Sequence, residues 1–596
     1  MSTENIKPIK GGEFLIRSTK PSEIFTPEEW TEEHQMIAQM CDDFIGQEVL
    51  PVLEKIDAME PGLMVSRLDK AGELGMLGLS VPEEFGGMGV DFKTSLLATE
   101  HLGKGFSFSV AYGAHTGIGS LPLLYYGTEA QKAKYSPLLA SGEWKAAYCL
   151  TEPSAGSDAN SGKTKAVLSE DGTHYLITGQ KMWITNGGFA DLMTVFAKIG
   201  DDKNLSAFLV EAKSEGITLN PEEKKMGIKG SSTRQVFYNN VKVPVENMLS
   251  TREAGFKIAL NILNIGRIKL AAGVMGGSKA TIMDSVKYAG EREQFGRSLN
   301  KYGAIRYKLA EQAIRTFVIE SATYRAGQNI DDAIKNHVSE GLDKGVATLK
   351  GIEDFAIECA ILKVAGSECL DYVADEAVQI YGGMGYSAES PVEKAYRDSR
   401  INRIFEGTNE INRMLIVDML LRKAMKGELD LMTPAMKVAG ELMSIPEAGE
   451  EVEGVFANEY KYLEGFKKAI LMIAGSAVQK LMQTLSKEQE VLMNVADIAI
   501  IIYQAESVLL RVDKMVQSKG ESASAAQIAI VKTFFYDASS KIEKAGKDAL
   551  NTFASEDELR MMLMGLKRFT KTEAFNPRDA RHLIASKMVE ANGYCF

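Results

Sequence analysis

Glu406 is the side chain in this sequence best suited to proton transfer. It lies in an Ile-Phe-Glu-Gly-Thr segment, with the apolar residues Ile404 and Phe405 before it and the flexible Gly407 after it. A carboxylate that is partly withdrawn from water has a raised pKa, which suits a general base that works near neutral pH. Most glutamates in loops are simply solvated, so the segment on its own indicates either a surface turn or a catalytic base.

Two segments upstream could hold a flat ring system. Residues 147–158, AYCLTEPSAGSD, offer hydroxyls and turn N–H groups, which can bind a heteroaromatic ring or a phosphate. Residues 181–188, KMWITNGG, place Trp183 and Thr185 two positions apart in an expected strand, so both side chains should point to the same side. Taken singly, the first segment is more typical of an ordinary turn, and a tryptophan in a strand usually belongs to the core.

The composition is that of an ordinary globular protein with several domains. The chain has 596 residues, of which 45% are hydrophobic and 25% charged, and it is too long for one domain. Its net charge of −12 argues against nucleic acid as a partner, because phosphate binding needs a basic face. Five scattered cysteines and six histidines show no metal-binding or disulfide pattern, so no metal site is expected.

No targeting or membrane-spanning segment is expected. The first residues, MSTENIKPIKGGEF, lack the apolar core of a secretory signal and the Arg-rich character of a transit peptide. The apolar run at 495–503 is interrupted by Asp497 and is far too short to span a bilayer. We therefore expect a reduced, soluble, cytoplasmic protein of bacterial type.

The order of hydrophobic patterns predicts a mostly α protein with an inserted β domain (α+β). The first helix is expected to begin at Thr26, as its N-cap, and to end before Pro51. The strands are predicted in HYLITGQKMWITNGG, LMTVFAKI, LSAFLVEA, GITLNPEE and RQVFYNNVKV. The expected parts are a helical domain at 26–146, a β domain at 147–250, a helical domain at 251–425, an acidic linker at 426–455 and an extra helical domain at 456–596.

The segment from 406 to 411, EGTNEI, preceded by YGGMGY at 381–386, resembles the C-terminal signature of the acyl-CoA dehydrogenases. The order and separation of 147–158 and 181–188 also resemble the flavin-binding signatures of that family. The extra region after about Met432 resembles the very-long-chain branch. The resemblance implies an N-terminal helical domain, a middle β-barrel-like domain, a C-terminal four-helix bundle carrying the base, and an additional helical domain.

In that family the glutamate of the EGT turn removes the α-proton of an acyl-CoA thioester while FAD takes a hydride from the β-carbon. The resemblance therefore implies Glu406 as the base; the isovaleryl-type branch keeps its base elsewhere, at the position that Gly266 occupies here. Substrate contacts are implied for Ser157, Asn264, Arg267, Phe405 and Gly407. FAD contacts are implied for Tyr148, Leu150, Thr151, Ser157, Trp183 and Thr185, and for FAD of a partner subunit at Arg292, Gln294, Phe295, Gln379, Gly382, Gly383, Thr408, Asn409 and Glu410.

The resemblance also implies partners. FAD shared across a subunit boundary implies a homodimer, and the family passes its electrons to electron-transferring flavoprotein. The small residues Gly113 and Ala114 either leave room for a long acyl tail or allow tight helix packing. The acidic linker disfavours more than peripheral membrane contact. Two alternatives stay open: an assembly or scaffold protein that keeps the fold without turnover, and an acyl-CoA oxidase in which oxygen reoxidises the flavin.

Overall fold

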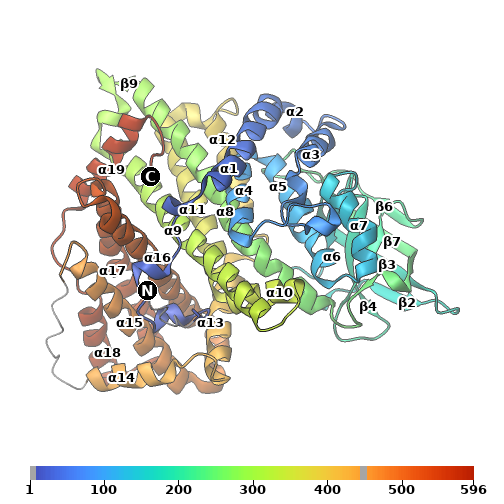
Figure 1. Ribbon diagram of the computed structural model, residues 1–596. Coiled ribbons are helices and arrows are strands. Elements are labelled where there is room, and N and C mark those ends of the chain that lie inside the picture. Colours follow the sequence, from blue (N-terminus) through green and yellow to red (C-terminus); the bar gives the residue numbers. More distant parts are fainter. Residues whose placement is uncertain (1–7, 443–452) are drawn as a thin grey trace.

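The computed structural model describes residues 8–442 and 453–596, which form a mostly helical molecule with one β region (Figure 1). The predicted fold class is therefore confirmed. In Figure 1 the N-terminal helices lie between the β region and the long helices of the C-terminal half. These first helices are α1 Glu32–Phe44, α2 Leu53–Asp57, α3 Leu63–Glu73, α4 Phe92–Leu102, α5 Ser107–Gly113, α6 Leu121–Tyr126 and α7 Glu129–Ser141, with a π-helical turn, Ala114–Gly119, between α5 and α6.

The first long helix begins later than predicted. Thr26 caps only a single 3-10 turn, Pro27–Glu29, and its backbone N–H donates to the Glu29 carboxylate at 2.8 Å. Helix α1 itself starts at Glu32. Between the two, Trp30 packs edge-on against Tyr324, with ring centroids 5.0 Å apart. This aromatic anchor from another domain redirects the chain, an effect that local capping signals do not reveal.

The β region is one eight-stranded sheet. Its strands follow the order β6-β7-β3-β2-β4-β5-β8, and β1 pairs in parallel with β4. All five predicted strands are present as β3 to β7, whereas β1, β2 and β8 are too short to show clear alternation in the sequence. The bounds are β1 Ala146–Cys149, β2 Lys165–Leu168, β3 His174–Thr185, β4 Leu192–Ile199, β5 Ser206–Glu211, β6 Ile217–Leu219, β7 Thr233–Pro244 and β8 Met248–Leu249.

Long helices build the domain that follows the sheet. Helices α8, α9 and α11 pack against one another, α13 packs against α11, and α8 also contacts α4 of the N-terminal domain. By length and composition alone α8 could cross a membrane, with a mean hydropathy of 1.4, but 67% of that apolar window is buried inside the protein. The bounds are α8 Gly255–Glu291, α9 Gly303–Ser339, α10 Lys344–Asp354, α11 Ala356–Tyr381, α12 Pro391–Ser399 and α13 Asn409–Met425.

The last domain is helical, as predicted, but its first helix lies inside the expected linker. Helix α14, Met432–Leu442, packs on α15 through Val438, which is only 3% exposed. Pro434 falls in the first turn of α14, where a missing N–H group is tolerated. Residues 443–452 of the expected linker lie outside the described residues. The remaining helices are α15 Ala457–Leu481, α16 Gln489–Lys519, α17 Ala525–Phe553, α18 Glu556–Phe569 and α19 Pro577–Ala591.

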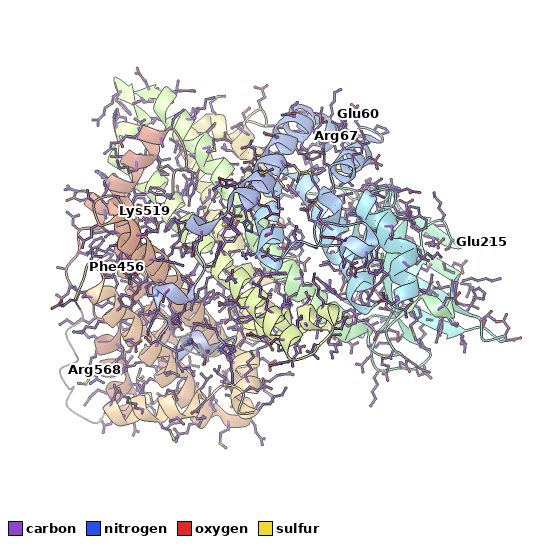
Figure 2. The ribbon with its side chains drawn as sticks, viewed as in Figure 1. Glu60, Arg67, Glu215, Phe456, Lys519 and Arg568 are labelled. Carbon is purple, nitrogen blue, oxygen red and sulfur yellow. The ribbon has the colours of Figure 1, made fainter. Side chains whose placement is uncertain are left out.

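This last domain covers the outer side of the α9 region. Figure 2 shows Phe456, Lys519 and Arg568 on the far side of the molecule from Glu215 of the β region. Consequently the extra domain stands well away from the sheet and packs on α9 and on α13, the helix that follows Glu406.

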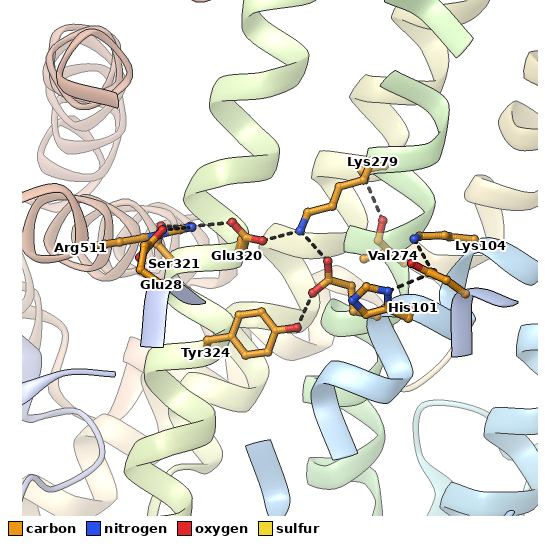
Figure 3. Close-up of polar contacts among 12 residues, drawn as sticks. Glu28, His101, Lys104, Val274, Lys279, Glu320, Ser321, Tyr324 and Arg511 are labelled. Atoms are coloured by element: carbon orange, nitrogen blue, oxygen red, sulfur yellow. Dashed lines mark hydrogen bonds and ion pairs between the residues drawn. The ribbon is translucent and has the colours of Figure 1, made fainter. Parts of the chain in front are cut away.

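A buried network of charges joins the extra domain to the rest of the chain (Figure 3). Arg511 of α16 donates to Glu320 of α9 at 2.6 Å and to Glu28 of the N-terminal segment at 2.7 Å. Lys279 of α8 donates to Glu320 and, at 2.5 Å, to Glu100 of α4. Three helical parts of the chain thus meet in one set of ion pairs, which fixes the extra domain against α8 and α9.

Candidate active site

Glu406 lies in a tight turn directly before helix α13. Its φ of 60° and the φ of 80° at Gly407 both fall in the left-handed region. A residue other than glycine adopts this conformation at a cost, and such strain is typically kept at functional sites. Thr408 then starts α13, because its side chain accepts a hydrogen bond from the N–H of Ile411 at 3.3 Å. The turn therefore aims the Glu406 side chain back toward helix α8.

The Glu406 carboxylate is withdrawn from water. Its Oε2 atom is buried and has no hydrogen-bond partner among the described residues. Burial raises the pKa of Glu406 from its ordinary value of 4.5 to about 7, although the nearby charges of Arg267 and Lys363 oppose the shift. The predicted raised pKa is confirmed. A carboxylate with this pKa and a free oxygen can accept a proton near neutral pH.

Gly266 of α8 provides the space in which the carboxylate lies. A Cβ atom at Gly266 would stand 2.7 Å from Oε2 and 2.9 Å from Cδ of Glu406. No real Cβ atom tolerates such contacts, so only glycine fits here while Glu406 keeps its position. In the sequence, Gly266 indicated that the alternative base is missing, and in the structure it leaves room for the Glu406 carboxylate.

We expect Gly266→Ala to lower kcat by about tenfold to a hundredfold, because the added methyl group must displace the carboxylate from the reacting carbon. Steady-state turnover of acyl-CoA, with FAD content measured in parallel, checks this. Gly273→Ala on the same helix is the matched control, since its Cβ would lie 3.8 Å from Thr99, an ordinary contact. An unchanged kcat in Gly266→Ala would contradict the role of this gap.

Two predicted substrate residues of α8 lie beside the turn. The Arg267 guanidinium donates to the carbonyl oxygen of Glu406 at 3.4 Å and to Oδ1 of Asn264 at 2.7 Å. Both residues are buried. Arg267 therefore supports the backbone of the catalytic turn, and Asn264 orients Arg267. Substrate contacts of either residue, and of Phe405 and Gly407, stay predictions.

Sequence reasoning missed Lys363. This buried lysine of α11 donates to the carbonyl of Gly407 and to Oδ1 of Asn409, both at 2.7 Å. Burial lowers the pKa of Lys363 to about 8. Asn409 was predicted to contact FAD, but its amide also donates to Ser367 at 3.0 Å and to Glu368 at 3.1 Å. Its side chain is thus occupied in holding the turn onto α11. In the sequence, the only indication of Lys363 is that its neighbours are apolar. That pattern is too common to identify a functional lysine.

We expect Lys363→Met to lower kcat about tenfold or more, because the turn loses two hydrogen bonds that fix Glu406. Removing this positive charge also raises the Glu406 pKa, so the acidic limb of the pH–rate profile should move to higher pH. A purely structural role would leave that limb in place. Lys363→Arg should restore part of the activity, and Lys350→Met on neighbouring α10 is the control. An unshifted profile would contradict the electrostatic part of this account.

The two segments predicted to face a cofactor ring meet in the structure. The N–H of Met182 donates to the carbonyl of Thr151 at 2.8 Å. Lys181 donates to the carbonyl of Leu150 at 3.1 Å and forms a buried ion pair with Glu152 at 2.7 Å. The Lys181 ammonium and its hydrogen bonds hold the pKa of Glu152 below its ordinary value despite burial. Sequence reasoning also missed this ion pair, which holds the two segments together.

The prediction that Trp183 and Thr185 share a face by simple alternation needs correction. The pairing of β3 with β7 shifts register between Lys181 and Ile184, and Trp183 has a φ of 61°. Trp183 therefore sits at a β-bulge, which reorients its side chain. Trp183 is still 52% exposed, whereas Ile184 is buried. An exposed aromatic ring beside the partly exposed Thr185 suits a flat cofactor.

A third residue predicted to contact the cofactor is Tyr148 of β1. Its ring is buried, and its hydroxyl has no partner among the described residues. Burial and then the charge of Glu406 raise the Tyr148 pKa well above its ordinary value, so the phenol is neutral and lies near the base. Leu150 is also buried, whereas Ser157 is exposed. The unpartnered hydroxyl of Tyr148 and the exposed Trp183 are groups that a flavin could contact.

The residues predicted to bind the cofactor of a partner subunit lie elsewhere. Arg292 ends α8, and Gln294 and Phe295 form a hairpin of β9 Glu293–Gln294 and β10 Arg297–Ser298. Phe295 is 95% exposed. In Figure 1 this hairpin and the β region lie at opposite ends of the molecule. The hairpin that follows Arg292 is thus separated from the β region within one subunit.

The ends of α8 and α11 meet beside this hairpin. Tyr288 and Tyr381 stack with ring centroids 3.9 Å apart, and the Tyr288 hydroxyl donates to the Tyr381 carbonyl at 3.2 Å. Directly after Tyr381, Cβ atoms at Gly382 or Gly383 would meet nothing within 4 Å. Gln379 is exposed. These predicted residues thus form a second, open cluster with Arg292 at the end of the helix pair.

Comparisons with known proteins agree with this geometry. Family models for the acyl-CoA dehydrogenase N-terminal, middle and C-terminal domains match residues 31–143, 147–241 and 253–421, and a further C-terminal domain model matches 465–568. A probable acyl-CoA dehydrogenase of Bacillus subtilis is 46% identical over 98% of both chains. The human mitochondrial very long-chain specific acyl-CoA dehydrogenase is 44% identical over 61% of this chain and 54% of its own length.

Solved structures show the same relationship. A Bacillus anthracis acyl-CoA dehydrogenase, crystallised with FAD, superposes with a TM-score of 0.96 at 44% identity and covers 99% of this chain and 100% of its own. Butyryl-CoA dehydrogenase of Megasphaera elsdenii matches at 34% identity with a TM-score of 0.60, and covers 66% of this chain but 99% of its own. The extra domain therefore lies outside the part shared with the smaller enzyme. With four domain models in order and a relative matched along nearly its whole length, this chain belongs to the acyl-CoA dehydrogenase family.

Proposed function

We propose that this acyl-CoA dehydrogenase, with FAD as its cofactor, oxidises long-chain acyl-CoA to trans-2-enoyl-CoA in fatty-acid β-oxidation. The observation that carries the proposal is the buried Glu406 carboxylate, with its free Oε2 and a pKa of about 7. Open space beside Gly113 and Gly117, where a Cβ would meet nothing within 4 Å, supports a roomy acyl pocket. The similarity to very long-chain specific enzymes supports the same chain-length class.

The chain's own residues supply the proton chemistry and the positioning. Glu406 removes the α-proton of the thioester and becomes a neutral acid, which its buried site favours over the anion. Bound FAD supplies the hydride acceptor for the β-carbon. Arg267 and Lys363 hold the carbonyls of Glu406 and Gly407, so the backbone N–H of Glu406 is fixed. That N–H is a suitable donor to the thioester oxygen as negative charge develops there.

FAD would be held by two clusters from different subunits. Tyr148, Leu150, Thr151, Ser157, Trp183 and Thr185 would contact its ring end. Arg292, Gln294, Phe295, Gln379, Gly382 and Gly383 of a second subunit, with Thr408 and Glu410, would hold the rest, with the Arg292 fork at the pyrophosphate. The 95% exposed Phe295 supports a subunit contact at this hairpin. A homodimer is the smallest assembly that completes the site.

The electrons would pass to electron-transferring flavoprotein, and the enzyme would work in the bacterial cytoplasm with at most peripheral membrane contact. Turnover of a series from butyryl-CoA to stearoyl-CoA, with this acceptor and with oxygen alone, tests the proposal. We expect the highest kcat/KM at palmitoyl-CoA or longer, and a dimer by light scattering. Rapid oxygen consumption would indicate an oxidase instead, and a flavoprotein without turnover would indicate a scaffold.

A further inference from the structure

Lys269 lies on α8 close to the residue that accommodates the Glu406 carboxylate. It is three residues after Gly266 on α8, and Gly266 is the residue against which the Glu406 carboxylate rests. Residues three apart share one face of a helix and lie about 4.5 Å apart along its axis. An acyl chain whose α-carbon is at Glu406 and whose tail follows this face therefore reaches Lys269 within a few carbons.

The side chain of Lys269 forms part of the wall of a cavity between the N-terminal domain and α8. The cavity has a volume of about 10 Å³, which is room for roughly one water molecule. Besides aliphatic side chains, its wall contains Ser80, Ser95, Tyr112 and Thr116. Such a polar wall is a poor match for a purely aliphatic tail, which gains nothing from hydroxyls or an ammonium.

Lys269 has no partner of its own. Across residues 8–442 and 453–596 it forms no hydrogen bond or ion pair, and no carboxylate lines the cavity. The Ser95, Tyr112 and Thr116 hydroxyls donate to the backbone carbonyls of Phe92, Met76 and Tyr112, at 2.7, 2.9 and 3.0 Å. These three hydroxyls are satisfied within the protein, whereas Lys269 has no acceptor among the described residues.

Two other lysines that are buried have a carboxylate partner. Lys181 is paired with Glu152 at 2.7 Å, and Lys467 with Glu506 at 2.6 Å. Burial without a counter-charge lowers the pKa of Lys269 to about 8, which still leaves most of it protonated at neutral pH. An ammonium that is partly withdrawn from water and has no anion beside it is costly to the fold. An unpaired ammonium at Lys269, so near Glu406, points to an anion that arrives with the ligand.

Space for a tail leads toward this cavity. Thr116, which lines it, belongs to the π-helical turn Ala114–Gly119, and this turn packs against both β1 and α8. Cβ atoms at Gly113 and Gly117 would meet nothing within 4 Å. The tail can therefore pass between this turn and α8. The cavity itself is nearly filled, so entry requires the unbonded Lys269 side chain to move, which costs no hydrogen bond.

Resting on the proposed acyl-CoA dehydrogenation, we propose that Lys269 binds a carboxylate at the far end of the acyl tail, so that ω-carboxyacyl-CoA thioesters are substrates of this enzyme. The backbone of Lys269 is fixed in α8, so only a narrow range of tail lengths brings the carboxylate to its ammonium. Shorter tails do not reach, and longer ones must fold back. The proposal concerns recognition only, and the reaction at Glu406 is the same for both kinds of tail.

The test compares substrates that differ only in charge at the tail end. Purified holoenzyme is assayed with a length series of ω-carboxyacyl-CoA thioesters and with their ω-methyl esters. At one length we expect the carboxylate to raise kcat/KM tenfold or more over the ester, as a charged hydrogen bond in a buried site would. Lys269→Met should remove this preference, by lowering kcat/KM for the acid and raising it for the ester. Lys257→Met, an exposed lysine of the same helix, is the matched control.

Each outcome decides between two claims. If unsubstituted acyl-CoA is oxidised but no length shows a preference for the carboxylate, the role of Lys269 is overturned and the proposed function stands. The same holds if Lys269→Met keeps the preference. If neither kind of acyl-CoA is oxidised, the proposed function fails and this inference fails with it. Should Lys269→Met not fold, the acid-to-ester comparison in the unaltered enzyme decides alone.

Discussion

Glu406→Gln is expected to lower kcat by about a hundredfold to ten-thousandfold, the usual contribution of a positioned general base. The amide has nearly the same shape as the carboxylate, so it still fits against Gly266 but cannot accept the α-proton. FAD content and acyl-CoA binding should be unchanged, because neither depends on this charge. Rapid-mixing measurement of flavin reduction under anaerobic conditions checks the result. Reduction at the normal rate would show that another residue is the base.

The same carboxylate sets the pH dependence of the unaltered enzyme. Because burial raises the Glu406 pKa from 4.5 to about 7, the group is protonated and inactive below pH 7, so kcat/KM should fall as the pH drops through that value. The folded state also binds this proton more tightly than the unfolded chain. Stability from this group is therefore complete below pH 4.5 and lost as the pH rises through 7. Glu406→Gln avoids that loss, so it should be at least as stable at pH 8, which separates lost chemistry from lost folding.

Arg511→Met is expected to destabilise the protein by about 3–5 kcal/mol, the typical cost of removing one partner from a buried ion pair. Arg511 is only 2% exposed, and it connects the extra domain to Glu320 and Glu28. Methionine fills a similar volume but leaves Glu320 with Lys279 as its one cation. A urea denaturation curve followed by circular dichroism should show the midpoint falling.

Two further variants make the stability test specific. Arg578→Met removes an exposed ion pair with Asp579 and should cost less than about 1 kcal/mol. Combining Arg511→Met with Glu320→Gln should recover part of the lost stability, because the under-neutralised carboxylate is removed as well. A midpoint unchanged by Arg511→Met would mean that the extra domain is held by its apolar packing alone.

The sequence predicted features that depend on local pattern. The β3 to β7 strands alternate clearly, and the apolar residues before Glu406 correctly indicated a buried carboxylate with a raised pKa. Features that depend on distant partners were not predictable. The sequence indicates a helix cap at Thr26, but the contact of Trp30 with Tyr324 makes the helix begin later. Helix α14 forms despite Pro434, because its contact with α15 stabilises it.

In the site, too, the features that depend on distant partners could not be predicted. In the sequence, Gly266 stood out because it is not the glutamate of the alternative branch. That it also leaves room for the Glu406 carboxylate becomes visible only when the turn and α8 are placed together. Nothing in the sequence distinguishes Lys363 from other lysines, because its role depends on the fold of α11, which brings it within hydrogen-bonding distance of the Gly407 carbonyl. The bulge at Trp183 depends on how β3 pairs with β7, and one strand's alternation contains no information about that register.

An anaerobic titration of the purified protein with palmitoyl-CoA, followed by flavin absorbance, tests the central claim most directly. We expect the absorbance near 450 nm to bleach as substrate is added, and Glu406→Gln to bind the same substrate without bleaching. A yellow protein that does not bleach with acyl-CoA of any length would contradict the account.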